Sequence, residues 1–514
     1  MKLFKLRLTT LKSKLYAIVF ASFVVRVVAF FALPSTPSAL GPDEGTYAKA
    51  ANWTALGKPA TDFPEYGAGL YASSRSILLP AAILDKIDIS ALNSVRIVAS
   101  LYGLLIIFLV TLIILKTVSK QAKLAEFIEQ NPTMFYSLFS VFTFVPSRFA
   151  WSILGLRESA TEFWVVSSFA LLFLILQSNK KVSFFTIFGL LVSIVMVFSA
   201  RPQVGWVLGV TLLLYLIFKL KERAAQILIP VTVAGILLGY TATVALSLEV
   251  RTTYTAVKES TSLTLSQTPK VSSTVPSKNT VKPSSGSQNS TSPMSTTSPM
   301  STTSPTPLTE PEADKLCKSD GQEIELNGVK YLCDSKVEKS EVVKLKNPGS
   351  VIIDQADSIP YHHEVNKIAA ASVIETQDCP NSGATRFDKY FCIAYKAPYT
   401  TFTFLFRPML GADVTSNSSL FAAVENLFWL GAFLFVVVMF IRNRRLAFFG
   451  ALAPSLLFFF FYSVSAGAYE GNMGTAFRHR SLILWVVILL LASTILASQQ
   501  RKAEREGISG SSQE

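Results

Sequence analysis

The sequence predicts an all-α polytopic membrane protein with about ten transmembrane helices and one small inserted extracytoplasmic module. Half of the 514 residues are hydrophobic, and the mean hydropathy of +0.42 is typical of a membrane protein rather than a soluble one. Apolar runs long enough to cross a bilayer recur along the chain. Short clusters of Lys and Arg separate alternate runs, which is the charge pattern of cytoplasmic loops.

The apolar runs give the predicted spans. They cover residues 15–33, 92–115, 132–147, 160–177, 183–200, 204–218, 226–246, 421–441, 446–465 and 481–498. The first run follows five basic residues and contains Arg26. Its length favours retention as a signal anchor, and cleavage near the small residues at 37–39 is the alternative.

The loop charges predict the topology. Basic residues occupy the start of the chain and then Lys116/Lys120/Lys123, Lys180/Lys181, Lys219/Lys221/Arg223, Arg442/Arg444/Arg445 and Arg501/Lys502/Arg505. The positive-inside rule then puts both termini in the cytoplasm and residues 34–91 and 247–400 outside. Because topology explains much of the net charge of +13, we predict no nucleic-acid partner.

The chain divides into five predicted parts. They are a transmembrane module (1–246) with its first external loop (34–91), an extracytoplasmic stalk (247–312), a Cys-containing module (313–400), a C-terminal transmembrane module (401–500) and a cytoplasmic tail (501–514). Amphipathic stretches at 48–56 and 77–87 predict surface helices in the first external loop. The stalk is rich in Ser, Thr and Pro, so it cannot bury a core and is expected to be disordered.

All four cysteines lie in the 313–400 module, at Cys317, Cys333, Cys379 and Cys392. An even set in an exported segment predicts two disulfides, and pairing of sequence neighbours is one of three possible connectivities. A metal site is the weaker interpretation, because no CxxC pair occurs. Short strand-like runs at 328–332 and 350–353 indicate a disulfide-braced α+β module.

An acidic pair, Asp43-Glu44, follows the first span in a proline-rich loop, with Tyr47 at a helical offset. A carboxylate at the membrane boundary can act as a general base or can hold a divalent cation such as Mg²⁺ or Mn²⁺ against a phosphate. The simpler interpretation is a pair of solvated loop acids, so the dipeptide alone does not decide the function.

Five arginines lie beside span ends on the face where the positive-inside rule disfavours them: Arg157, Arg201, Arg407, Arg478 and Arg480. A guanidinium group binds two phosphate oxygens at once and stays charged, which suits a lipid-linked phosphate. Interfacial snorkelling is the alternative for each one taken singly. Their gathering on one face favours a shared function. Glu158 and Glu425 are the acids at the starts of neighbouring spans.

The acidic pair in the first external loop, Tyr47, the amphipathic loop helices and the multi-span scaffold resemble the GT-C integral-membrane glycosyltransferases. The likeness is to their protein-mannosyltransferase-like and aminoarabinose-transferase-like branch, and it is best over residues 1–246. The resemblance implies an enzyme of the plasma membrane that transfers a sugar from a polyprenyl-phosphate donor to an acceptor on the extracytoplasmic face, by inverting single displacement. The acceptor would be a cell-envelope glycan, lipid or protein.

The resemblance also implies roles for individual residues. Asp43 would be the base, and Glu44 would support it or help to hold a cation; no other cofactor is expected. The predicted donor phosphate-binding residues are Arg157, Arg201, Arg407, Arg478 and Arg480, and the predicted substrate-binding residues are Tyr47, Tyr71, Arg75, Glu158 and Glu425. The chain lacks a clear acidic pair in its second external loop, so the metal requirement stays open.

Three other functions compete with this one. In a polysaccharide polymerase or ligase, the external arginines would hold a diphosphate-linked glycan. A transporter of lipid-linked sugars predicts ionisable residues deep in several spans; Arg26 is the most obvious mid-span charge, which counts against a relay. A scaffold or receptor would act through the 247–400 insertion. ATP-driven transport is disfavoured because the chain has no P-loop.

Overall fold

A computed structural model describes the helical body of the chain and one hairpin. The described residues are 2–37, 43–58, 74–120, 128–176, 183–261, 323–326, 329–332, 385–411, 413–414, 417–442, 449–470 and 473–511. Residues 1–251 and 347–514 belong to one compact unit, and residues 252–346 belong to a second.

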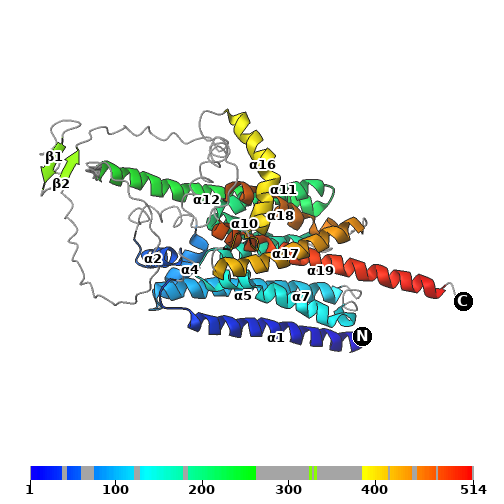
Figure 1. Cartoon of the computed structure of the whole chain (residues 1–514). Coiled ribbons are helices and arrows are strands. Elements are labelled where there is room, and N and C mark those ends of the chain that lie inside the picture. Colours follow the sequence, from blue (N-terminus) through cyan, green and yellow to red (C-terminus); the bar gives the residue numbers. More distant parts are fainter. Residues whose placement is uncertain are drawn as a thin grey trace, which may run out of the picture. The chain divides into compact units, whose positions relative to one another are not determined.

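The first unit is built from helices (Figure 1). They are α1 (Lys2–Ala32), α2 (Glu44–Ala55), α4 (Arg75–Asp85), α5 (Ala91–Lys120), α7 (Pro132–Phe144), α8 (Pro146–Ile153), α9 (Glu158–Leu176), α10 (Phe184–Ala200), α11 (Pro202–Phe218), α12 (Arg223–Thr261), α16 (Arg386–Phe406), α17 (Asn417–Arg442), α18 (Phe449–Tyr469) and α19 (Met473–Ser511). The helices α2 and α4 confirm the two amphipathic helices predicted for the first external loop.

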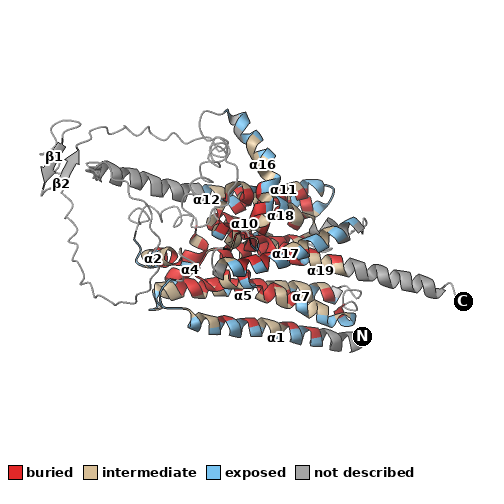
Figure 2. Ribbon diagram, in the orientation of Figure 1, coloured by how far each residue is buried: buried red, intermediate tan, exposed pale blue. Residues whose placement is uncertain are grey.

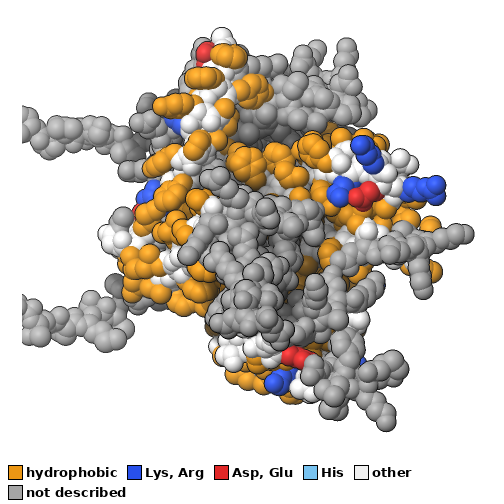
Figure 3. All heavy atoms as spheres, turned by 90° about the vertical axis from the view of Figure 1, so that its right-hand side faces the viewer, with side chains coloured by type: hydrophobic (Ala, Val, Ile, Leu, Met, Phe, Trp, Pro, Cys, Tyr) orange, Lys and Arg blue, Asp and Glu red, His pale blue; other side chains and the backbone are white. Residues whose placement is uncertain are grey.

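Six helices are long and apolar enough to cross a membrane by length and composition, within the described part of the chain. These stretches are Thr9–Ala32, Ala91–Ser119, Glu158–Leu176, Arg223–Ala242, Ser419–Val438 and Met473–Ile495. Shorter apolar helices cover Phe184–Ala200, Pro202–Phe218 and Ala453–Tyr469. An all-α membrane protein is therefore supported, whereas ten spans stay a prediction. Apolar side chains cover much of the described surface in Figure 3, as expected for helices that face lipid.

The predicted third span, 132–147, is broken into α7 and α8. Pro146 has no N–H to donate to the preceding turn, and its ring pushes the residue before it out of the helical region. Val145 accordingly has φ −54° and ψ 128°, and a new helix starts at Pro146. The break matters for the site because it exposes the N-terminus of α8 to a side chain of α17.

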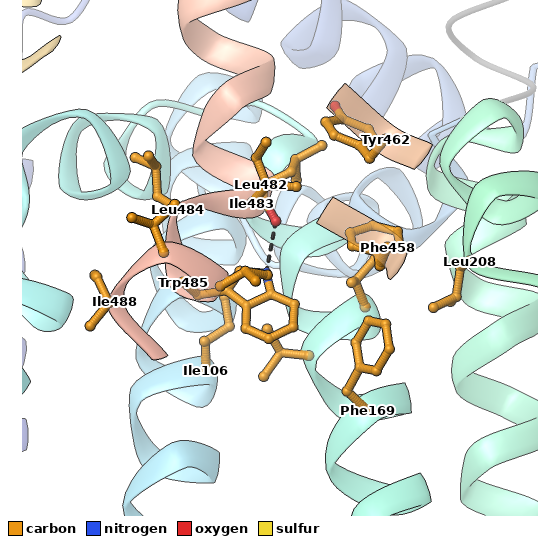
Figure 4. Packing of buried hydrophobic residues seen from close by; sticks show 14 of the residues in the cluster. Ile106, Phe169, Leu208, Phe458, Tyr462, Leu482, Ile483, Leu484, Trp485 and Ile488 are labelled. Carbon is orange, nitrogen blue, oxygen red and sulfur yellow. Dashed lines mark hydrogen bonds between the residues drawn. The ribbon is translucent and has the colours of Figure 1, made fainter. Parts of the chain in front are cut away.

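The core lies where α9, α10, α18 and α19 meet, and Figure 2 shows the buried residues concentrated there. Phe169 on α9 contacts both Phe458 and Trp485, with ring centroids 5.5 Å apart in each pair (Figure 4). The Trp485 indole donates to the Leu482 carbonyl at 2.8 Å, which satisfies its N–H inside the apolar core. Above this layer Tyr462 stacks on Phe458 at 5.7 Å and marks the level at which polar side chains begin.

Two helices cross the predicted boundaries of the insertion. The helix α12 continues past residue 246 to Thr261, because residues 247–261 are polar and yet compatible with a helix. The helix α16 crosses the predicted boundary at 400 and carries Cys392, which is disulfide-bonded. Cys317, Cys333 and Cys379 lie outside the described residues, so the connectivity stays a prediction.

The second unit contributes one described hairpin. The strand β1 (Glu323–Leu326) pairs antiparallel with β2 (Val329–Leu332), with Glu323 opposite Leu332. The strand predicted at 328–332 is thus confirmed, whereas most of the stalk and the run at 350–353 fall outside the described residues.

Candidate functional site

Four charged side chains from distant parts of the sequence form a continuous ion-pair chain. Asp43, before α2, accepts from Arg478 on α19 through Oδ2 and Nη1 at 2.8 Å. The same arginine places its Nε 3.2 Å from Oε1 of Glu158, at the start of α9. Arg201, between α10 and α11, contacts that carboxylate oxygen at 2.5 Å. The structure therefore brings Asp43, Glu158, Arg201 and Arg478 together as one site.

Local sequence explains why these side chains reach each other. Asp43 occupies the N-cap position of α2 and makes no side-chain capping bond, so its carboxylate is available to α19. Arg201 stands between two helices because Pro202 ends α10 and starts α11. Its extended backbone (φ −154°, ψ 101°) directs the chain from one helix into the next.

Arg157 and Tyr47 complete the cluster. The Arg157 guanidinium donates to the Ser74 hydroxyl at 3.4 Å and interacts electrostatically with Tyr47, Glu158, Arg201 and Arg478. Burial lowers the pKa of Arg157 and raises the pKa of the Tyr47 phenol. Arg75 starts α4 beside Ser74, and Tyr71 lies outside the described residues.

The cluster has a surplus of positive charge. Three guanidinium groups (Arg157, Arg201 and Arg478) meet two carboxylates (Asp43 and Glu158), which leaves one positive charge. Two of its buried atoms, Oε2 of Glu158 and Nε of Arg201, have no hydrogen-bond partner within the described ranges. A buried polar atom left without a partner costs about 1–3 kcal/mol. Nε of Arg201 suits an anionic ligand, whereas Oε2 of Glu158 needs a hydrogen-bond donor.

Sequence reasoning missed one pair in this cluster. Glu470, between α18 and α19, is hydrogen-bonded through Oε1 to Nδ1 of His479, and both side chains are buried. Burial raises the pKa of Glu470 to about 7, against the opposing influence of Arg201 and Arg478. The stretch is notable in sequence for its arginines, but no spacing rule joins an acid to a histidine nine positions later across a loop.

The structure gives Glu44 a structural role in place of the predicted catalytic one. Its carboxylate accepts from Nε of Arg96 at 2.6 Å and from Nη2 at 2.9 Å, and the Gly155 amide donates to it at 3.1 Å. Arg96 also donates to the carbonyls of Pro34 and Thr36. Because both oxygens are engaged and the side chain is fully buried, Glu44 joins the first external loop to α5 instead of serving a substrate or a cation.

Arg407 and Arg480 also contact protein groups, although Nη2 of Arg480 is buried and has no hydrogen-bond partner among the described residues. Arg407 binds the Asp413 carboxylate through Nε and Nη2, and these hydrogen bonds hold the pKa of Asp413 below its ordinary value. Arg480 is buried and donates to the carbonyls of Leu405 at 2.5 Å and Arg407 at 3.2 Å. Both arginines thus contact the turn after α16, and phosphate binding by them stays a prediction.

Glu425 also contacts protein groups. It accepts from the amide and hydroxyl of Ser147 at 2.9 and 2.5 Å and from the Trp429 indole at 3.0 Å. The carboxylate thus accepts from one free backbone N–H at the start of α8, the helix created by the break at Pro146. Substrate binding by Glu425 stays a prediction.

The acidic residues of the site do not form a metal-ligand set. Among the residues that the structure describes, no three or more His, Cys, Asp or Glu side chains lie close enough together to hold a metal ion. The acids of the site have other partners, because Asp43 and Glu158 pair with arginines and Glu470 pairs with His479. Comparison with known protein families, curated proteins and solved structures finds no match for this chain.

Proposed function

We propose that this chain is a membrane glycosyltransferase that moves a sugar from a polyprenyl-phosphate donor to an extracytoplasmic acceptor. The observation that supports the proposal most is the meeting of Asp43 with Arg157, Arg201 and Arg478 in one cluster. A transfer of this kind needs a base for the acceptor hydroxyl and a cationic site for the leaving phosphate. Asp43 could serve as the base, and the three neighbouring arginines could serve as the cationic site.

Asp43 is the candidate base. Its side chain is 45% exposed, so an acceptor hydroxyl can approach it from the aqueous side. Arg478 contacts the same carboxylate and therefore orients it, while its exposed fraction of only 15% keeps that arginine in place. In the proposed step the acceptor oxygen attacks the anomeric carbon, its proton passes to Asp43, and the bond from that carbon to the phosphate oxygen breaks.

The arginines would stabilise the charge that builds on the departing phosphate. Arg157 and Arg201 lie at the N-termini of α9 and α11, where free backbone N–H groups also favour an anion. Guanidinium groups that are preorganised in a partly dehydrated site give large stabilisation without rearrangement during the reaction. The positive surplus of the cluster matches the single negative charge of a phosphodiester donor.

The test separates the base from the phosphate site. Asp43→Asn keeps the size of the side chain but removes its basicity, so turnover should fall roughly 10²–10⁴-fold while the protein still binds farnesyl phosphate. Arg201→Ala should weaken farnesyl phosphate binding about tenfold or more, because it removes a charge-assisted contact. Turnover is measured as restoration of the missing envelope glycan in cells that lack the gene, and binding is measured on the purified protein.

Lys219→Ala is the matched control for Arg201→Ala, because Lys219 pairs with Glu222 at an exposed loop between α11 and α12. Full glycan restoration by Asp43→Asn would contradict the assignment of the base. If that variant were active while Arg478→Ala restored nothing, a polysaccharide polymerase or ligase would be the better interpretation.

One observation favours a lipid-linked sugar transporter as a second candidate. Arg26 on α1, Arg148 on α8 and Glu162 on α9 are all buried, and Arg148 contacts Glu162 at 2.6 Å. The Arg26 guanidinium donates to Ser152 on α8 at 3.1 Å. Ionisable groups inside spans are expensive and often functional. Transport predicts that Glu162→Gln abolishes lipid-linked sugar export, whereas the transferase predicts export without transfer in Asp43→Asn cells.

A further inference from the structure

The proposed transfer leaves one buried ionisable pair of the site unused. Glu470 and His479 are 3% and 8% exposed and are joined through Oε1 and Nδ1. The second oxygen of Glu470 and Nε2 of His479 are both buried and have no hydrogen-bond partner among the residues that the structure describes. The pair therefore has one internal hydrogen bond and two further polar atoms that a ligand could satisfy.

Every element around the pair contributes a polar group. Tyr462 on α18 donates to the backbone carbonyl of His479 at 3.3 Å. Arg157 and Glu158 at the start of α9, Arg201 before α11 and Arg478 on α19 are all near enough to act electrostatically on Glu470. Tyr469, at the end of α18, adjoins Glu470 in the chain. The pair thus borders the same arginines that we propose to hold the donor phosphate.

The charge of the site depends on one proton. Neutral His479 carries one N–H proton of its own, so the pair is neutral when it holds one further proton, whichever of the two groups carries that proton. With that proton the pair is neutral and the arginine cluster keeps its surplus of one positive charge. Without it the pair is an anion, and the surplus is cancelled. The pKa of Glu470, raised to about 7 by burial, places this change near neutral pH.

We propose that Glu470 and His479 form a proton-holding pair that binds a phosphate ester together with Arg157, Arg201 and Arg478 and returns the proton to that phosphate as it leaves. This inference rests on the proposed function. The acceptor oxygen forms its bond to the anomeric carbon and gives its proton to Asp43. The bond from the anomeric carbon to the phosphate oxygen breaks with its electron pair on that oxygen. Nε2 of His479 then gives its proton to the phosphate, the proton between Oε1 and Nδ1 stays on Nδ1, and the pair is left as a carboxylate and a neutral imidazole until it takes up a proton from water.

The experiment measures protons taken up when a ligand binds to the full-length protein in a detergent without phosphate. The probe is farnesyl methyl phosphate, a phosphodiester whose own charge does not change near neutral pH. Binding of an anion favours the protonated pair, so calorimetry in two buffers of different ionisation enthalpy should give an uptake of roughly half to one proton per ligand at about pH 8. The affinity should be about five- to tenfold weaker at pH 8.5 than at pH 6.5.

Variants assign the proton. Glu470→Gln is permanently neutral, so it should bind the probe with an affinity that does not depend on pH and with no proton uptake. His479→Asn can keep the contact to Glu470 but lacks Nε2, so it should bind about tenfold more weakly. Glu222→Gln, in the loop between α11 and α12, is the matched control and should behave as the wild type. Dimethyl phosphate, which lacks the lipid chain, is titrated in parallel. If the protein binds it as tightly as farnesyl methyl phosphate, the proposal that the ligand is lipid-linked is overturned.

The outcomes separate this inference from the proposed function. Probe binding by the wild type with no proton uptake and a flat pH profile overturns the role of the pair and leaves the arginine site intact. Equal proton uptake by Glu470→Gln and the wild type also overturns the role of the pair and leaves the arginine site intact. No probe binding by the wild type at any pH overturns the phosphate site itself and with it the proposed function. The wild-type pH profile decides the matter even if Glu470→Gln does not fold.

Discussion

Asp43 and Glu44 are consecutive acids whose side chains meet opposite surroundings. One step along a helix rotates a side chain by about 100°, since a turn has 3.6 residues. Asp43 stays at the aqueous edge and contacts Arg478, whereas Glu44 enters the protein and binds Arg96. At the residue scale, then, chemical type is a weak guide to role. Exposure and existing partners separate the candidate base from the structural ion pair.

The Glu44–Arg96 pair should be essential for stability. Glu44→Gln keeps the shape but leaves the Arg96 guanidinium buried without a counter-charge, which typically costs about 3–5 kcal/mol. Asp43→Asn is the control, and its half-exposed ion pair should contribute only up to about 1 kcal/mol. Thermal unfolding of the purified variants measures the difference. Equal melting temperatures for the two would show that Glu44 is not structural.

Arg478 and Arg480 are two positions apart and should also behave differently. Arg480→Ala removes the donors that hold the carbonyls at 404–407, so the protein should lose stability and keep farnesyl phosphate binding per folded molecule. Arg478→Ala should lose binding about tenfold or more, because its guanidinium belongs to the ion-pair chain. Unfolding and binding assays on the same preparations separate the effects. Loss of binding in Arg480→Ala alone would reverse these roles.

At the scale of elements, close helix contacts fix the positions of the polar residues. The helices α16 and α18 approach each other at Gly467, where an added Cβ would lie 2.8 Å from the backbone carbonyl of Thr400. Phe404 on α16 then contacts Tyr462 on α18, with ring centroids 6.1 Å apart. This packing fixes the position of Tyr462 on α18. The Tyr462 hydroxyl donates to the backbone carbonyl of His479 and thereby helps to fix His479 as well.

Gly467→Ala should force α16 and α18 apart. Backbone atoms cannot move away cheaply, so we expect destabilisation of about 1–3 kcal/mol. Gly431→Ala, on α17, is the matched control because nothing lies within 4 Å of an added Cβ there. Alanine favours a helix over glycine by up to about 1 kcal/mol, so the control should be neutral or stabilised. Chemical unfolding measures the stability of both variants. If Gly467→Ala is as stable as Gly431→Ala, the two helices are not in close contact at Gly467.

For the whole molecule, the contacts agree with the predicted alternation of the helices. The start of α9, the junction of α10 with α11 and the first turns of α19 meet in the ion-pair chain. Helices that alternate in direction across a membrane bring those ends to one face. The opposite ends of α11 and α12 carry the Lys219–Glu222 pair. The site thus gathers at one end of the bundle.

The topology predicts which introduced cysteines react in intact cells. Met300→Cys, in the predicted external stalk, should be labelled by a membrane-impermeant maleimide. Asn443→Cys, in the basic loop after α17, should react only after the cells are permeabilised. The two sites serve as controls for each other. If Met300→Cys is labelled only after permeabilisation, the predicted topology is inverted, and the arginine cluster lies on the cytoplasmic side.

The sequence by itself determined the helical membrane class, the loop helices and the common face of Asp43, Arg157, Arg201 and Arg478. Hydrophobic runs, amphipathic periods and loop charges are local signals, and they can be read without knowing how the helices pack. Only the tertiary structure shows which protein groups Glu44, Arg407, Arg480 and Glu425 contact, and that Glu470 meets His479. Whether a charged side chain is satisfied by protein or left for a ligand depends on partners far away in the sequence. Those partners become neighbours only when the helices pack.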